Sequence, residues 1–323
     1  MTILLIIILV FAGLLIFKGK ATLHERLFPR LYNTIDFPED HFPPADPKNY
    51  LRKVAAGYEK MKAVKVVICG VTKDDGAILP LTMARIEKTG GLFRNYRVII
   101  YENDSQDNTP DILKQWQTVN PRVKIITESI ADTPLMGITR TERLAFFRNR
   151  YLQHIRESGE YADYDFVIVA DMDLKGGWSN DGIATSFAHS GWDIVAGNSI
   201  GYHNLRKSYY DIFALRPKTI LNTGFVYKII GDGWQLRRGD PLISVQSGFG
   251  GLALYRKEAI ISRQYSGTVN GQTMCEHVSL NADHSLRCFL NPSQITLIGT
   301  QEEKKYQPGS SLGNTLFGLF RNW

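Results

Sequence analysis

The sequence predicts an α/β protein whose central sheet is mostly parallel and flanked by helices, and three observations support this prediction. From residue 65 onward, runs of β-branched residues alternate with segments of helical character. The runs are apolar at consecutive positions, as in strands buried on both faces, and they end in polar residues or glycine. The chain has 323 residues, 44% hydrophobic and 22% charged, which excludes disordered, collagen-like and multi-span membrane proteins.

The expected elements follow one another along the chain. Strands are predicted at 65–71, 96–103, 123–129, 164–173, 192–203 and 209–216, and helices at 77–90, 107–119 and 140–157. Ligands of parallel sheets bind at the carboxyl ends of the strands. The first strand ends at Gly70 and Thr72, which are therefore candidate binding residues.

The N-terminus is strongly biased. Residues 3–17 are apolar and uncharged, and Lys18 and Lys20 follow, so we expect residues 1–20 to form an uncleaved membrane anchor. The positive-inside rule places the rest of the chain in the cytoplasm, with a lumenal orientation as the alternative. Residues 21–60 contain five prolines and are expected to be an irregular lead-in outside the core.

The main domain is predicted at 61–300, followed by a C-terminal tail at 301–323. The net charge is +6, and half of it comes from residues 18–30, where four basic residues face one glutamate. That flank suits anionic lipid. The remaining basic residues form no single stripe with interleaved aromatic residues, so nucleic acid is not an expected partner.

Asp171 and Asp173 carry the strongest local signal. They lie one residue apart at the end of an apolar strand, where two carboxylates can share a hard divalent cation that also binds phosphate oxygens. The alternative is structural, because aspartates at strand ends often cap the next loop.

Two further groups accompany this pair. Glu102, Asn103 and Asp104 follow the second strand and can bind a nucleobase edge and ribose hydroxyls; the alternative is an Asx-turn before the next helix. Arg140 and Arg148 are eight residues apart, about two helical turns, so they share a face that can meet phosphates or simply solvent.

These segments, with YENDSQDNT, R-x-x-x-L-A-x-x-R-N and VIVADMD in that order, resemble the nucleotide-sugar half of the GT-A-fold glycosyltransferases. More narrowly they resemble the fungal capsule-associated α-1,3-mannosyltransferase family, over roughly residues 64–290. The resemblance implies a Rossmann-like GT-A domain. It also implies Asp173 as the main ligand of Mn²⁺ or Mg²⁺, Asp171 on metal or ribose, Glu102 and Asp104 near the nucleoside, and Arg148 near the diphosphate.

The resemblance extends to the second half of the chain. Gly250 and Gly251 would line the donor and acceptor sugars. Glu276 would meet the acceptor hydroxyl, or His277 would complete the metal shell, with His284 as a rival ligand. Asp211 is a candidate for binding sugar hydroxyls, and Trp178, Trp192 and Trp234 are candidates for stacking on sugars, although core packing is their default.

The expected function is therefore metal-dependent transfer of a hexose, in one reading mannose, from a nucleotide-diphosphate sugar to a glycan or lipid-linked acceptor. Resemblance to α-mannosyltransferases favours retention of configuration, whereas Glu276 as a general base favours inversion. Two alternatives stay open. One is a nucleotidyltransferase acting on sugar phosphates, and the other is a membrane-tethered sugar-binding protein without turnover.

Overall fold

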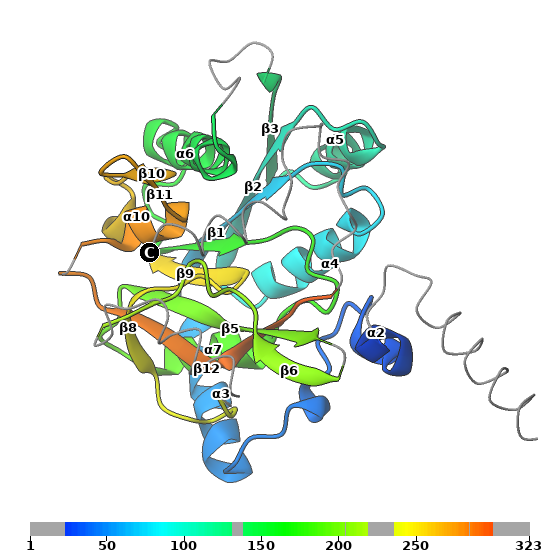
Figure 1. The fold of residues 1–323 in the computed structure, drawn as a ribbon, viewed down its shortest axis with the longest axis vertical. Coiled ribbons are helices and arrows are strands. Elements are labelled where there is room, and N and C mark those ends of the chain that lie inside the picture. The colour runs from blue at the N-terminus through cyan, green and yellow to red at the C-terminus, as the bar shows by residue number, and fades with distance from the viewer. Residues whose placement is uncertain (1–22, 131–137, 204, 219–235, 284, 300–323) are drawn as a thin grey trace, which may run out of the picture.

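A ten-stranded sheet forms the centre of the computed structural model, which describes residues 23–130, 138–203, 205–218, 236–283 and 285–299 (Figure 1). The strand order is β3-β2-β1-β4-β9-β5-β12-β8-β7, and β6 pairs with β5. The strands are β1 (Lys65–Thr72), β2 (Asn95–Asn103), β3 (Val123–Glu128), β4 (Phe166–Ala170), β5 (Ile194–His203), β6 (Arg206–Tyr209), β7 (Arg216–Pro217), β8 (Ile243–Ser247), β9 (Leu252–Arg256) and β12 (Cys288–Leu297). A separate hairpin joins β10 (Thr268–Val269) to β11 (Gln272–Thr273).

Most of the sheet runs in one direction. β1 pairs in parallel with β2 and β4, β2 pairs in parallel with β3, and β12 pairs in parallel with β5. β9 is inserted antiparallel between β4 and β5. The carboxyl ends of β4 and β5 therefore lie at the same edge as the amino end of β9, and this edge holds the candidate site.

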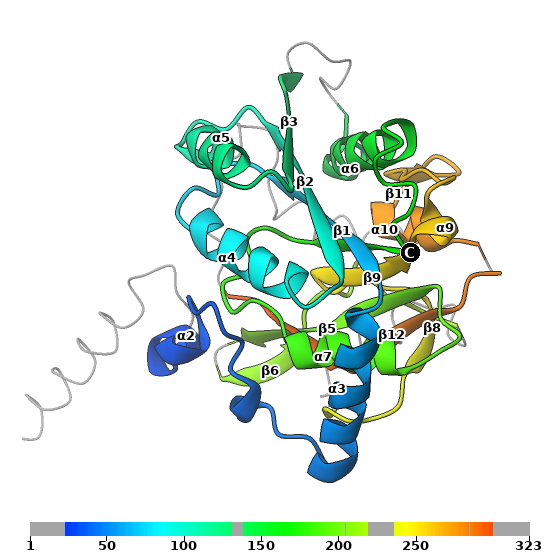
Figure 2. The same cartoon turned by 180° about the vertical axis from the view of Figure 1, so that it is seen from behind.

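Helices cover both faces of the sheet (Figures 1 and 2). The described helices are α2 (Leu23–Leu27), α3 (Pro47–Met61), α4 (Leu79–Gly90), α5 (Thr109–Val119), α6 (Arg140–Glu157), α7 (Asn180–Ala188), α9 (Lys257–Ile260) and α10 (Glu276–Asn281), with the 3-10 turns η1 (Pro29–Leu31) and η2 (Glu39–His41). The helix predicted at 140–157 has the bounds of α6, and its start carries a capping box between Thr139 and Glu142.

The alternation of side chains along β1 shows why its sequence is apolar throughout. Val67 and Cys69 join a core cluster with residues of α6 and α10. Val66 and Ile68 join a second cluster, on the other face, with residues of α3, α4, α5 and α7. A strand buried on both faces cannot alternate apolar and polar residues, so the predicted mostly parallel, doubly covered sheet is confirmed.

The structure differs from the prediction for residues 21–60. Instead of an irregular lead-in outside the core, Pro47–Met61 form helix α3, which packs on α7. Pro47 occupies the first turn of this helix, where its missing N–H costs nothing, and the Asp46 carboxylate caps it by accepting from Asn49 N (3.1 Å). The prolines thus mark the starts and turns of ordered elements.

The strand predicted at 209–216 is also wrong. β6 ends at Tyr209, and the chain then turns before the short β7. The turn forms because Asp211 N donates to the Ser199 hydroxyl (3.0 Å), which replaces a strand partner. Asp211 is thereby placed next to β9.

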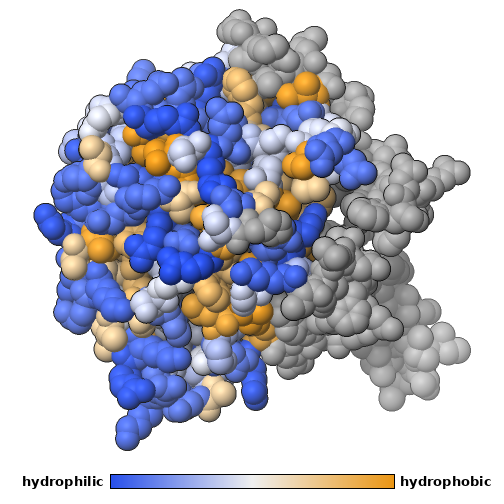
Figure 3. Space-filling model, turned by 90° about the vertical axis from the view of Figure 1, so that its left-hand side faces the viewer, coloured by the Kyte–Doolittle hydropathy of each residue, from blue (hydrophilic) through white to orange (hydrophobic). Residues whose placement is uncertain are grey.

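The expected anchor at 1–20 and the expected tail at 301–323 lie outside the described residues. Within the described ranges, no helix combines the length and apolar character needed to cross a bilayer. On the face shown in Figure 3, hydrophilic side chains predominate, and apolar ones form separate small areas.

Gly57 fixes the close contact between α3 and α7. A Cβ at this position would lie 1.7 Å from Ala184 O, and a backbone carbonyl cannot rotate away. Gly57→Ala is expected to lower the free energy of unfolding by about 1–3 kcal/mol, because the clash outweighs the gain of about 1 kcal/mol in helix propensity. Urea denaturation measures this effect. The control is Gly91→Ala, where the nearest atom would be 3.3 Å away, and an equal loss in both variants would contradict the packing explanation.

Candidate active site at the carboxyl edge of the sheet

The end of β1 is shaped by two of the predicted residues. The Thr72 hydroxyl donates to Asp75 Oδ2 (2.7 Å). A Cβ at Gly70 would lie 2.5 Å from Met172 Sδ, so Gly70 leaves room for the side chain between Asp171 and Asp173. Both residues therefore serve to shape the site in this structure.

Much of the backbone of the loop after β1 is already occupied by hydrogen bonds to side chains. Its four consecutive N–H groups all donate to side-chain oxygens: Lys73 to Asp75 Oδ2 (3.2 Å), Asp74 to Ser105 Oγ (3.0 Å), Asp75 to Thr109 Oγ1 (2.9 Å) and Gly76 to Asp107 Oδ2 (2.8 Å). These bonds tie the loop after β1 to the loop after β2. A phosphate-cradling loop needs such amides free.

Glu102, at the end of β2, and Asp104, directly after it, hold the neighbouring loop in place. Glu102 is buried, and its Oε1 accepts from Ser105 N (3.0 Å). Asp104 has a positive φ of 47°, and its carboxylate accepts from Ile130 N and Ser129 Oγ, both at 2.8 Å. Burial acts to raise the pKa of Asp104, but these hydrogen bonds outweigh it, so its pKa is lowered.

The loop that carries Asp171 and Asp173 is held from two sides. On one side Asp171 N donates to Gly251 O (2.8 Å), which joins the loop to the start of β9. On the other side the Thr82 hydroxyl of α4 donates to Met172 O (2.8 Å). The backbone between the two aspartates is therefore fixed before any ligand binds.

Arg85 is a third clamp on this loop. Its guanidinium is buried and donates to Leu174 O (2.5 Å), Lys175 O (2.8 Å) and Thr34 O (2.8 Å). Burial lowers the pKa of Arg85 to about 10. Because these three bonds all go to backbone carbonyls, Arg85 fixes the course of the chain directly after Asp173.

Arg148, on helix α6, contacts the loop that carries Asp171 and Asp173. It is buried on α6, with Nη2 3.3 Å from Asp171 Oδ1 and Nε 3.1 Å from Glu276 Oε1. Glu276, at the start of α10, is 4% exposed. This places Arg148 and Glu276 behind Asp171, where they orient it, and not on an open face of α6. Arg140, the first residue of that helix, is exposed.

Asp211 lies on the other side of Asp171. Its Oδ2 accepts from Gly250 N (2.8 Å). Gly250 has a φ of 69°, and a Cβ there would lie 2.1 Å from Gly197 O, so only glycine allows β9 to begin this close to β5. Gly250 thus positions Asp211, and the next residue, Gly251, positions Asp171.

The edge carries more negative than positive charge. Burial raises the pKa of Asp171 to about 7; Arg148 lowers it, while Asp173 and Asp211 raise it. Burial also raises the pKa of Asp211. The pKa of Tyr210 is raised by burial and then by all three aspartates. A bound cation would offset this repulsion.

The residues present fit a divalent ion that takes part of its shell from a substrate. Among the described residues, no three His, Cys, Asp or Glu side chains are grouped to hold a metal. Two carboxylates are nevertheless sufficient for an ion of the Mg²⁺ type, which keeps waters and binds phosphate oxygens. Asp171 and Asp173 supply these two.

His277 is not placed with the aspartates, in contrast to its predicted role as a metal ligand. Its ring stacks on Phe249 (centroids 3.8 Å apart), and Nδ1 is 3.2 Å from the Tyr255 hydroxyl. Nε2 lies 3.7 Å from Glu276 Oε1. Burial, then the charge of Arg148, lowers the pKa of His277 well below its ordinary value. The imidazole is a neutral core residue, because the surrounding rings exclude water.

The tryptophans considered for sugar stacking are also in the core where they are described. Trp178 and Trp192 are 4% and 1% exposed. Their indole N–H groups donate to Thr89 Oγ1 and Ser186 O, both at 2.9 Å. His284 and Trp234 lie outside the described residues.

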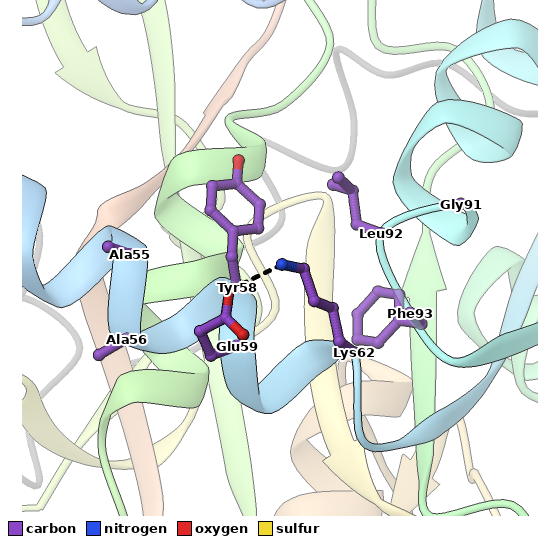
Figure 4. A pocket seen from close by; sticks show the side chains of 8 residues that line it. All are labelled: Ala55, Ala56, Tyr58, Glu59, Lys62, Gly91, Leu92 and Phe93. Carbon is purple, nitrogen blue, oxygen red and sulfur yellow. Dashed lines mark hydrogen bonds and ion pairs between the residues drawn. The ribbon is translucent and has the colours of Figure 1, made fainter.

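A groove of about 740 Å³ is remote from this edge. It lies between the C-terminal half of α3 and the segment after α4, and it is lined by Ala55, Ala56, Tyr58, Glu59, Lys62, Gly91, Leu92 and Phe93 (Figure 4). Lys62 pairs with Glu59 across 2.7 Å within it. None of the predicted site residues lines this groove.

Arg85 and Tyr210, two neighbours of the site, are not predicted from the sequence. Arg85 resembles any helical arginine in the sequence, and only the position of α4 beside the loop reveals its contacts. Tyr210 lies in a segment that was expected to be a strand. Its position next to Asp211 is the one signal that was available.

Comparisons with known proteins add similarities at low identity. No protein-family model and no curated protein matches the sequence. Mannosyltransferase PcManGT from Pyrobaculum calidifontis, in complex with GDP-Man and Mn²⁺, is similar over 80% of this chain and 66% of that chain, with 14% identity and a TM-score of 0.45. S. aureus TarS 1–349 is similar over 72% and 60%, with 14% identity and a TM-score of 0.41.

M. tuberculosis glucosyl-3-phosphoglycerate synthase is similar over 78% of this chain and 77% of that chain, with 10% identity and a TM-score of 0.42. This chain spans less than two thirds of the length of PcManGT and TarS 1–349. Because the identities are 10–14% and the TM-scores are below 0.5, these similarities do not assign the chain to a family. The function is therefore argued from the site itself.

Proposed function

We propose that this protein is a metal-dependent GT-A glycosyltransferase that transfers a hexose, for which we favour mannose, from a nucleotide-diphosphate sugar to a glycan or lipid-linked acceptor. One observation carries the proposal. The charges of Asp173 and Asp211 both act on Asp171 at the carboxyl edge of the sheet, and the buried guanidinium of Arg148 opposes them. A cation with a diphosphate suits this arrangement.

The two aspartates of the loop would hold the ion, and the residues around them set their geometry. A bound Mn²⁺ or Mg²⁺ neutralises charge on the departing diphosphate. Arg148 orients Asp171 through its hydrogen bond, while Thr82 and Arg85 fix the backbone on either side of Asp173. A preformed site of this kind needs little reorganisation when charge develops.

The nucleoside would lie over the ends of β1 and β2. Glu102 and Asp104 border that region, and their own hydrogen bonds keep its loops in shape. Glu276 and Arg148 lie deeper, as an ion pair behind Asp171. We therefore assign Glu276 a positioning role in preference to that of a general base.

The nucleotidyltransferase alternative receives no support from the first loop, in which four consecutive amides, from Lys73 to Gly76, donate to side chains of the protein. The non-catalytic alternative differs in its consequences. A sugar-binding protein without turnover would release no nucleotide from any donor.

Nucleotide release tests the proposal. The full-length protein in detergent is incubated with GDP-, UDP- and dTDP-hexoses with Mn²⁺ or with a chelator. We expect Mn²⁺-dependent release from at least one donor. Absence of release from every donor, with and without candidate glycan acceptors, would overturn the enzymatic proposal.

Arg85 provides a second prediction, about metal affinity. Arg85→Met keeps the apolar stem but loses three hydrogen bonds to the backbone, so the loop after Asp173 is expected to loosen and Mn²⁺ affinity to fall about tenfold. Isothermal titration with Mn²⁺ measures the affinity directly. Lys114→Met, on an exposed face of α5, is the control. Equal Mn²⁺ affinity in both variants would mean that Arg85 does not position the loop.

We also propose that residues 1–20 attach the protein to a membrane, with the domain in the cytoplasm. The support is the apolar run at 3–17 followed by Lys18 and Lys20. Protease treatment of sealed vesicles carrying the full chain distinguishes the orientations. In vesicles whose cytoplasmic face is outside, we expect digestion of the domain, and its protection would indicate the lumenal alternative.

A further inference from the structure

We infer that Tyr210 forms a platform for a pyranose ring of the acceptor, directly beside Asp211. The inference rests on the proposed glycosyltransferase function and adds the place and chemistry of the acceptor subsite. It starts from an exposed aromatic residue at an acidic edge: Tyr210 is 50% exposed, although Trp178 and Trp192 are in the core.

The backbone under Tyr210 is rigid. Tyr210 N donates to Ser199 O (3.0 Å), and Asp211 N donates to the hydroxyl of the same serine (3.0 Å). The ring lies over Gly201 of β5, where an added Cβ would be 3.3 Å from Tyr210 Cδ2. One part of the ring thus rests on the strand, and its exposed part is open to a ligand.

A short chain of hydrogen bonds connects this ring with the metal-binding loop. Tyr210 is the neighbour of Asp211, whose Oδ2 accepts from Gly250 N (2.8 Å). The next residue, Gly251, accepts from Asp171 N through its carbonyl (2.8 Å). Burial raises the pKa of Tyr210, and the charges of Asp173, Asp171 and Asp211 raise it further. The ring and the acidic edge therefore belong to one site.

The strand order places Tyr210 on the acceptor side. The nucleoside is proposed over β1 and β2, and the diphosphate at the end of β4. Across the sheet, β9 and β5 follow on the far side of β4. Tyr210 is bonded to β5, so Asp171 lies between it and the nucleoside. A donor that spans β2 to β4 leaves this position for the acceptor.

The chemistry of the position suits a sugar. A pyranose has an apolar face of C–H groups and a rim of hydroxyls. An aromatic ring packs against the face, and carboxylates such as Asp211 accept from the rim. Phe213, three residues later, is a second aromatic side chain that is partly exposed (36%). A polyisoprenoid or peptide acceptor would need an extended groove, whereas one ring beside a carboxylate matches a single sugar unit.

The test measures sugar binding directly. Saturation-transfer NMR is recorded on the full-length protein in detergent with the methyl α- and β-glycosides of mannose, glucose and galactose, in the presence of Mn²⁺ and nucleoside diphosphate. We expect at least one glycoside to bind, with saturation concentrated on the C–H protons of one face. Tyr210→Ala is expected to weaken that binding about tenfold, whereas Tyr210→Phe keeps it within about threefold.

The control is Leu205→Ala, which removes an exposed side chain elsewhere on the same hairpin and is expected to bind as the wild type does. Absence of binding by every glycoside, or equal binding by Tyr210→Ala and wild type, would overturn the inference. Nucleotide release by the wild type is recorded in parallel. If nucleotide release depends on Mn²⁺ but Tyr210→Ala does not change glycoside binding, only the assignment of Tyr210 is wrong. If no donor releases nucleotide, the proposed function is wrong.

Discussion

Asp173→Asn is expected to reduce Mn²⁺-dependent nucleotide release about a hundredfold or more. The substitution keeps the shape of the side chain and removes the charge that would hold the ion next to the diphosphate. Loss of a group that stabilises developing charge typically costs about 3–4 kcal/mol of transition-state stabilisation. Because 1.36 kcal/mol corresponds to a factor of ten in rate, this equals two to three orders of magnitude.

The same substitution is expected to leave the folded state as stable as before, or slightly more stable. Burial raises the pKa values of Asp171 and Tyr210, and the charge of Asp173 raises both further, so towards these two neighbours that charge is repulsive. Removing the charge relieves this repulsion. Activity and stability are therefore expected to change in opposite directions, which distinguishes a functional carboxylate from a loop cap, whose loss would lower stability.

Initial rates of nucleotide release and urea unfolding curves provide the two measurements. Asp111→Asn, at an exposed position in the first turn of α5, is a matched change of charge and is expected to retain activity. If Asp173→Asn releases nucleotide as fast as the wild type, the proposal that Asp171 and Asp173 hold the metal ion is refuted. A loss of stability like that of a buried cap would assign Asp173 to structure instead.

Much of the fold follows from local signals in the sequence. The β-branched runs predicted β1, β2, β3 and β4. β1 and β4 are almost wholly buried and therefore apolar, whereas β3, at the edge of the sheet, contains the exposed Lys124 and Thr127. The capping box at Thr139 sets the start of α6. The first polar residues after each run mark the carboxyl edge of the sheet. Asp171 and Asp173 could therefore be placed correctly at the end of β4 without any knowledge of tertiary contacts.

Other features depend on contacts between distant segments. The bond from Arg148 to Glu276 joins residues 128 positions apart, and the bond from Asp211 to Gly250 joins residues 39 apart. No local pattern encodes such pairs. His277 shows the same limit: the family resemblance suggested a metal ligand, but the ring packs on Phe249 in the core.

The lead-in at 21–60 was misjudged for a different reason. Five prolines in this stretch predict an irregular chain, but a proline in the first turn favours a helix. Pro47 after Asp46 is a helix start, and Val54 and Met61 are spaced to bury one face of α3. The signal was present, but the density of prolines concealed it.

Arg148→Met is expected to lower the free energy of unfolding by about 3–5 kcal/mol, the cost of removing one partner of a buried ion pair. The side chains of Arg148 and Glu276 are each 5% exposed. Without the guanidinium, the buried carboxylate of Glu276 loses its ion pair, and Asp171 loses the side chain that orients it. Methionine fills most of the volume, so the effect measures the charge and the hydrogen bonds more than a cavity.

Arg150→Met is the matched control on the same helix. Arg150 pairs with Glu128 at 2.9 Å, but both side chains are about one-third exposed, so this loss should cost no more than about 1 kcal/mol. The double variant Arg148→Met with Glu276→Gln should be more stable than Arg148→Met alone, because it removes the isolated carboxylate. Urea unfolding of the four proteins tests the whole set. Equal losses in the two single arginine variants would show that the buried pair contributes no more to stability than the partly exposed pair of Arg150 and Glu128.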